Sequence, residues 1–218
     1  MRVSIVHRNS HAPKQLPSRE ATRRRILDGA LKLFSQKGYL GATTKEIARE
    51  ANISEMTLFR HFPTKEVLFE SVLSTHSFLP ALKEILPAIK GKPPEEALAL
   101  IARKYLATLE RRKDFIKILL SQSEFFPEKM HTIYHAFLSE LFSTLAAYLR
   151  EMQSEGILRQ FDPMLGARAF LAMFFTYFLT KDILRFQGTE QKSTDTVIRE
   201  YVGYFINGTL REYTAMAR

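Results

Sequence analysis

Cysteine is absent from this chain of 218 residues. A protein without thiols has no disulfide framework, no thiolate nucleophile and no cysteine-based zinc site. Long apolar runs are also absent: the longest uncharged one covers residues 169–180, whereas a membrane-spanning helix needs about 20 apolar residues. The first ten residues, MRVSIVHRNS, lack the sustained apolar stretch of a secretory signal. We therefore expect a cytoplasmic or nucleoid-associated protein with no membrane partner.

Patterns that are typical of enzymes are missing as well. The sequence has no nucleophile elbow, no glycine-rich phosphate-binding loop and no evident pair of catalytic carboxylates. His131 and His135 are four residues apart, with Glu128 one turn earlier, so this helical segment has the spacing to hold a metal ion. No glutamate follows His131, which excludes the H-E-x-x-H arrangement of metalloproteases, and histidine pairs are common on helix surfaces. We expect neither an enzyme, nor a metal site, nor a cofactor.

Positive charge is concentrated in the first third of the chain. Residues 1–70 contain 13 Lys and Arg against 7 Asp and Glu, whereas residues 71–218 contain 19 against 16. An excess of this kind is what a polyanion-binding surface requires, although surface charge also varies by chance. Hydrophobic residues make up 45% and charged residues 25% of the chain, as in globular proteins.

The spacing of apolar residues predicts an all-α protein of about nine helices, and no segment has a convincing strand pattern. Glycine, proline and capping residues divide the chain into these helices. The expected helices cover residues 18–37, 43–51, 54–62, 64–79, 95–109, 113–123, 127–156, 163–186 and 193–213.

The most informative segment reads ATTKEIAREANISEMTLFRHFPTKE, from Ala42 to Glu66. Thr43 and Glu46 have the spacing of a capping box, which starts one short helix. Asn52 enters the left-handed conformation more readily than most residues, so the chain can turn sharply there. Ser54 caps a second helix, which ends before the next proline. Two short helices joined by a tight turn form the unit that places its second helix in the DNA major groove.

Residues 22–70 also resemble the N-terminal domain of TetR-type regulators. That domain typically has an IL-x-x-A-x-x-LF-x-x-x-G helix, then TT-x-x-x-IA, then S-x-x-T-L-Y/F-x-x-F and a K-E pair. This sequence departs from the pattern at Asn52, which replaces the usual turn glycine, and at Met56, where a small residue is common. The matching residues are Ile26, Leu27, Ala30, Leu33, Phe34, Gly38, Thr43, Thr44, Ile47, Ala48, Ser54, Thr57, Leu58, Phe59, Phe62, Lys65 and Glu66.

Residue type and position predict the DNA contacts. Arg60 is placed to reach a guanine, and Met56 or Thr57 to touch a thymine methyl group. Lys45 can reach a phosphate or a base, and Lys65 adds its charge to a helix N-terminus, which favours phosphate. The resemblance implies backbone-facing positions at Thr44, Phe59, His61 and Lys65. The full predicted set is Thr44, Lys45, Ser54, Met56, Thr57, Phe59, Arg60, His61 and Lys65.

Thirteen of the twenty-five aromatic residues fall between Phe115 and Phe178. Most of them are expected to be ordinary core residues, but phenylalanine, tyrosine and methionine together also suit an adaptable pocket for apolar ligands. The resemblance implies an effector pocket in this C-terminal domain. The predicted lining residues are Tyr105, Leu109, Phe115, Leu119, Tyr134, Phe137, Phe174 and Phe178.

The helix expected from Pro163 has no charge between Arg168 and Lys181 and is apolar on every face. A helix that is apolar all round must be buried on all sides, so part of its surface is expected to meet a second subunit. The last helix is similarly apolar. The resemblance implies a homodimer in which the last two helices form a four-helix interface, and the alternative is that both helices lie wholly inside one monomer.

These observations predict a four-part chain. Residues 1–17 form a mobile basic tail, 18–63 a three-helix helix-turn-helix DNA-binding domain, 64–79 a connecting helix, and 80–218 an effector-binding and dimerisation domain. The expected function is a ligand-responsive transcriptional regulator, a repressor that binds a palindromic operator in double-stranded DNA and is released by a small apolar effector. The alternative is an architectural or adaptor protein that binds DNA and a protein partner rather than a small molecule.

Overall fold

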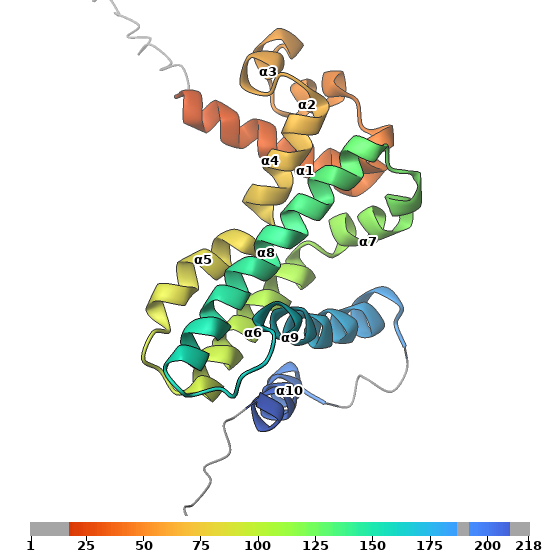
Figure 1. The fold of residues 1–218 in the computed structure, drawn as a ribbon. Coiled ribbons are helices and arrows are strands. Elements are labelled where there is room, and N and C mark those ends of the chain that lie inside the picture. The colour runs from red at the N-terminus through yellow and green to blue at the C-terminus, as the bar shows by residue number, and fades with distance from the viewer. Residues whose placement is uncertain (1–17, 187–191, 210–218) are drawn as a thin grey trace, which may run out of the picture.

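The computed structural model describes residues 18–186 and 192–209, and over these residues the chain forms ten α-helices and no β-strand (Figure 1). The all-α prediction is therefore confirmed. The predicted basic tail, residues 1–17, and the predicted end of the last helix beyond residue 209 lie outside the described residues.

The first helix, α1 (Arg19–Gly41), begins where Ser18 accepts a hydrogen bond from the backbone N–H of Ala21. Gly38 interrupts the helix with φ of +73°, and only a short extra turn follows it. Glycine enters this left-handed region without a steric cost, which is why the helix ends its regular part here, as predicted.

The predicted helix-turn-helix consists of α2 (Thr44–Glu50) and α3 (Glu55–His61), and α4 (Lys65–His76) follows. Both bonds of the capping box at Thr43 are present. Asn52 occupies the turn with φ of +53°. In Figure 1, α2 and α3 lie at one end of the molecule and α10 (Thr194–Thr209) lies at the other.

The helix α5 (Leu79–Ala88) was not predicted. The predicted helix of residues 64–79 was expected to end at the proline that follows it. Pro80 instead lies in the first turn of α5, where the missing N–H of a proline would have no helical partner in any case. The long helices α6 (Pro94–Arg111) and α8 (Glu128–Ser154) follow, with the shorter α7 (Lys113–Gln122) between them.

The helix α9 (Pro163–Phe178) continues as a π-helical turn, Leu179–Ile183. Together they form 21 residues that are long and apolar enough to cross a membrane by length and composition, which the shorter uncharged run in the sequence did not indicate. This segment packs on α6 and α8 inside the larger domain. Only 39% of its most apolar window is buried within the chain, so a large apolar surface remains uncovered.

Two hydrophobic cores run through the molecule. The first contains side chains of α1 to α4, together with Phe115 and Leu119 of α7, Phe126 of the following connection and Met130 at the start of α8. The second is built from α5, α6, α8, α9 and α10. Because α7 and α8 supply residues to the first core, the end of the molecule that carries α2 and α3 is packed directly on the larger domain.

Candidate functional site

The helix α3 presents exposed side chains at the end of the molecule. Met56 has 76% of its surface exposed and Phe59 has 41%, and Arg60 is exposed four residues after Met56. Lys45 is exposed on α2. Leu58 lies on the opposite side of α3, fully buried in the first core. Ser54, which caps α3, is exposed as well, so the structure exposes five of the nine predicted DNA contacts.

The predicted hydroxyl contacts already have local partners. Thr44 Oγ1 donates a hydrogen bond to the carboxylate of Glu55, which joins α2 to α3. Ser54 Oγ accepts a hydrogen bond from the Thr57 N–H at 3.1 Å and lies 2.9 Å from Thr57 Oγ1. In the protein alone the Thr44 hydroxyl thus links the two helices, whereas those of Ser54 and Thr57 cap the start of α3.

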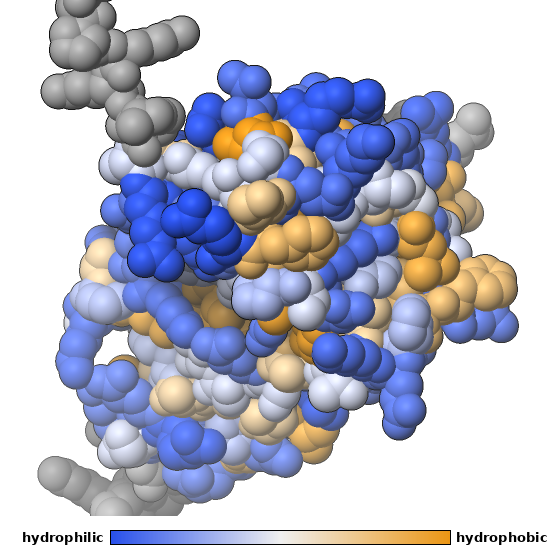
Figure 2. All heavy atoms as spheres, turned by 90° about the horizontal axis from the view of Figure 1, so that it is seen from above, coloured by the Kyte–Doolittle hydropathy of each residue, from blue (hydrophilic) through white to orange (hydrophobic). Residues whose placement is uncertain are grey.

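Positive charge converges between the start of α1 and the end of α3. The pKa of His61 is lowered, first by burial and then by the charges of Arg19, Arg60 and Arg23. The guanidinium of Arg23 lies over the ring of Phe62, 4.9 Å from its centre. Figure 2 looks down on this end of the molecule and shows hydrophilic side chains over much of it, with hydrophobic patches between them. Arginines gathered in this way attract an anionic partner.

Lys65 stands at the first position of α4, after the capping residue Thr64. Its Nζ lies 4.4 Å from the centre of the Tyr39 ring, a cation–π contact that holds the ammonium group in place. Burial lowers the pKa of Lys65, and the nearby carboxylate of Glu66 opposes this effect. A held cation at a helix N-terminus suits a phosphate group.

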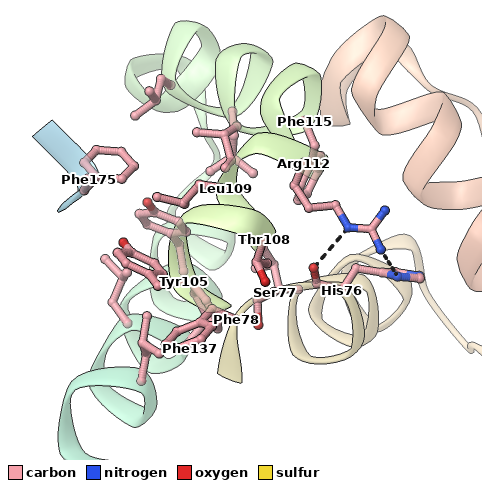
Figure 3. A pocket seen from close by; sticks show the side chains of 17 residues that line it. His76, Ser77, Phe78, Tyr105, Thr108, Leu109, Arg112, Phe115, Phe137 and Phe175 are labelled. Atoms are coloured by element: carbon pink, nitrogen blue, oxygen red, sulfur yellow. Dashed lines mark hydrogen bonds between the residues drawn. The ribbon is translucent and has the colours of Figure 1, made fainter. Parts of the chain in front are cut away.

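A second candidate site is a cavity of about 120 Å³ where the two cores meet (Figure 3). Its walls come from the end of α4, the corner before α5, and from α6, α7, α8 and α9. The structure brings together six of the eight predicted lining residues, which are Tyr105, Leu109, Phe115, Leu119, Tyr134 and Phe137.

Phe174 and Phe178, which were predicted to line the effector pocket, do not line this cavity. Both are fully buried in the second core, and the ring of Phe174 packs 5.1 Å from that of Phe170 and 5.6 Å from that of Tyr201. Phe175 faces the cavity instead. Because α9 is apolar on all faces, its sequence carries no signal for which face turns toward the cavity.

The cavity wall also contains polar side chains that were not predicted, namely His76, Ser77, Thr108 and Arg112. Arg112 donates from Nε to the carbonyl oxygen of His76 at 3.2 Å, and its Nη2 lies 3.1 Å from Nδ1 of the same residue (Figure 3). The other ring nitrogen of His76, Nε2, lies 3.5 Å from the carboxylate of Asp28 on α1. No periodic pattern in the sequence connects these residues, which come from three separate helical regions.

The environment changes the protonation of these groups. The pKa of His76 is lowered, first by burial and then by the charge of Arg112. Burial raises the pKa of Tyr105 and of Tyr134, so both phenols stay neutral. Neither phenol has a hydrogen-bond partner among the described residues. The cavity therefore offers apolar walls, two neutral phenol groups that lack a partner in the described part of the chain, the hydroxyl groups of Ser77 and Thr108, and one cation.

The histidine pair of α8 is not part of a group of metal-ligating side chains among the described residues. The rings of His131 and His135 lie 6.4 Å apart. Within residues 18–186 and 192–209, no three His, Cys, Asp or Glu side chains are grouped to hold a metal ion.

Comparisons with known proteins agree with this geometry. Residues 26–72 match the family described as "Bacterial regulatory proteins, tetR family", and residues 96–214 match "AefR-like transcriptional repressor, C-terminal domain". The chain is 37% identical over 160 residues to the HTH-type transcriptional regulator YvkB of Bacillus subtilis (strain 168), which covers 72% of this chain and 82% of that protein.

Solved structures share the fold. A putative TetR-family regulator from Mesorhizobium loti superposes with a TM-score of 0.68 at 24% identity, over 89% of this chain and all of that one. FadR from Bacillus subtilis, solved in complex with stearoyl-CoA, superposes with a TM-score of 0.67 at 20% identity, over 85% of this chain and 98% of that one. With two family matches that together span most of its length, this chain belongs to the TetR family and is a helix-turn-helix, DNA-binding transcriptional regulator.

Proposed function

We propose that this protein is a ligand-responsive repressor. It binds a palindromic operator in double-stranded DNA as a homodimer and leaves it when a small apolar effector enters the cavity. The position of the cavity carries this proposal: it lies where the two cores meet, and its walls include the last residue of α4, the helix whose first residue is Lys65 at the DNA-facing end. A ligand there contacts both parts of the chain.

In this proposal each part of the chain has its own function. Residues 18–63 read DNA, residues 64–79 connect, and residues 80–218 bind the effector and the second subunit. Arg60 and Met56 reach base edges in the major groove, while Lys45 and Lys65 contact phosphates. Two copies related by a two-fold axis place their α3 helices about 34–36 Å apart, one turn of DNA. An effector that favours a different separation releases the protein, provided that it binds the two states unequally.

The cavity limits the size and the charge of the effector. Its volume of about 120 Å³ is close to that of an engineered apolar cavity of about 150 Å³ that binds benzene. A single aromatic ring or a short acyl chain fits the cavity in this conformation. A group with several charges does not, because burying unpaired charges costs several kcal/mol.

A release assay tests this function. Operator fragments selected from random DNA are bound to the protein, and small aromatic and short-chain compounds are screened for stabilisation and then for release. We expect Tyr134→Ala to weaken release by the active compounds. Tyr148→Ala, on the same helix but outside the cavity wall, is the matched control and should respond like the wild type.

Two results would contradict the proposal. Release by strongly polar metabolites alone would show that the effector is not apolar. Release by no small molecule, together with binding at many scattered DNA sites, would support the alternative of an architectural or adaptor protein with a protein partner.

A further inference from the structure

The cavity wall contains one formally charged side chain and no acidic one. Among its lining residues Arg112 is the only lysine or arginine, and no aspartate or glutamate is present. The remaining walls are apolar apart from hydroxyl groups and the imidazole of His76. An anionic ligand group therefore meets a cation and no opposing charge on the cavity side.

Arg112 has free capacity to bind such a group. A guanidinium carries five N–H donors, and the described residues take up two of them, both at His76. Within the described part of the chain Arg112 forms no ion pair with a carboxylate. A planar guanidinium with unused donors matches a carboxylate through two parallel hydrogen bonds.

Arg112 and His76 also form the partition between the cavity and an outer groove. Both residues line that groove, together with Glu20, Arg23 and Asp28 of α1. Figure 3 shows the Arg112–His76 pair at the edge of the cavity, away from Tyr105 and Phe137. A ligand with an apolar body inside thus has its head group at the polar edge, where the cost of desolvating a charge is smallest.

From this placement we propose that the effector is an amphipathic monocarboxylic acid, whose carboxylate binds Arg112 and whose ring or short chain fills the apolar cavity. The inference rests on the proposed effector function and specifies its chemical class. Because the same guanidinium holds the carbonyl group of His76, a carboxylate on its remaining donors is joined through Arg112 to the last residue of α4. Binding of the acid therefore acts on the contact between α4 and the junction of α6 and α7.

Matched pairs of compounds test whether Arg112 anchors the carboxylate of the effector. Each pair has the same body and differs in the head group: benzoate with benzamide, and hexanoate with hexanamide. Dissociation constants are measured by calorimetry with the full chain at pH 7.5. We expect the acid of at least one pair to bind about tenfold more tightly than its amide, as a charge-assisted bidentate contact allows.

Variants assign the preference to one residue. Arg112→Gln should bring the acid-to-amide ratio close to one, and Arg112→Lys should keep part of it. Arg111→Gln, at the exposed neighbouring arginine, is the matched control and should keep the full ratio. Thermal melting without ligand verifies that each variant is folded. The acid-to-amide ratio of the wild type tests the acid preference even if a variant fails to fold.

The outcomes separate this inference from the proposed function. If amides bind and release DNA as well as acids do, the Arg112 anchor is wrong while the effector pocket remains. If Arg112→Gln keeps the acid preference in a folded protein, the anchor lies elsewhere and the inference is overturned. If none of the four compounds binds at millimolar concentration, both the anchor and an effector of this size are rejected.

Discussion

Two cations at the DNA-facing end differ in their surroundings. Arg60 is exposed on α3, whereas Lys65 is half-buried against Tyr39 at the start of α4. A freely extending guanidinium suits a base edge, and a cation fixed at a helix N-terminus suits a phosphate. Substitution of the two residues should therefore change DNA binding in different ways.

We expect Lys65→Ala to weaken binding to every DNA sequence and to reduce the slope of log affinity against log salt by about one. Arg60→Ala should relax the preference at one position of each half-site. Polarisation titrations with operator and mismatched DNA at several salt concentrations measure both effects. Lys83→Ala is the control, because Lys83 lies on α5, which packs in the second core. Equal DNA binding by all three variants would refute the assignment.

His76 gives the protein a pH-dependent stability. Its pKa is below the ordinary value of about 6.5 because of burial and the charge of Arg112, and Asp28 opposes this shift from α1. The unfolded chain thus takes up a proton on this ring at a higher pH than the folded chain does. The stability that the neutral ring contributes is complete above about pH 6.5 and is lost as the pH falls through the folded pKa.

We expect the free energy of unfolding of the wild type to fall more steeply between pH 7.5 and pH 5 than that of His76→Gln. Urea titrations across this range measure the difference. His61, whose pKa is also lowered, is present in both proteins and cancels in the comparison. Parallel curves would show that His76 does not titrate in this range.

At the scale of the helices, the joint between α1 and α7 depends on Gly38. Its φ of +73° is costly for any residue with a side chain. A β-carbon there would also lie 2.0 Å from Oε1 of Gln122, at the end of α7. That oxygen is buried without a hydrogen-bond partner among the described residues, so the carboxamide already fits tightly.

We expect Gly38→Ala to lower the free energy of unfolding by at least about 1–2 kcal/mol through backbone strain, and displacement of the Gln122 carboxamide adds to this loss. Gly41→Ala is the control, since Gly41 has no positive φ and its nearest neighbour lies at 3.4 Å. Denaturant unfolding compares the two variants. A neutral Gly38→Ala would mean that α1 can end without the left-handed residue.

At the scale of the molecule, an apolar surface remains open on the last two helices. Leu165 and Leu184 expose 61% and 64% of their surfaces, and Tyr204 on α10 exposes 62%. Exposed apolar side chains on two helices that pack together indicate an interaction surface. A second copy of the chain that covers it would bury the uncovered side of α9.

We expect sedimentation to give about twice the chain mass of 25.2 kDa at micromolar concentration without DNA. Tyr204→Lys should shift the protein toward the monomer, because a charge in an apolar interface is costly to bury. Phe125→Lys, at a residue that is 69% exposed but lies between α7 and α8, should leave the dimer intact. A stable wild-type monomer would place the interface elsewhere.

The sequence by itself determined the starts of α1 to α4 and the helix-turn-helix. Ser18, Thr43, Ser54 and Thr64 each accept a bond from a backbone N–H three residues later, so the signal and its effect lie within one turn. The same locality explains why the end of the regular part of α1 at Gly38 could be predicted. Gly38, Thr43 and Ser54 are also among the residues on which the family resemblance rests.

Only the tertiary structure decided the cavity in detail. Phe175 lines it rather than Phe174, because an all-apolar helix takes its orientation from the helices packed around it and not from its own pattern. Arg112 and His76 are 36 positions apart, and their contact exists because α4 ends beside the junction of α6 and α7. The charge in the cavity wall therefore depends on packing between distant segments, which no local pattern encodes.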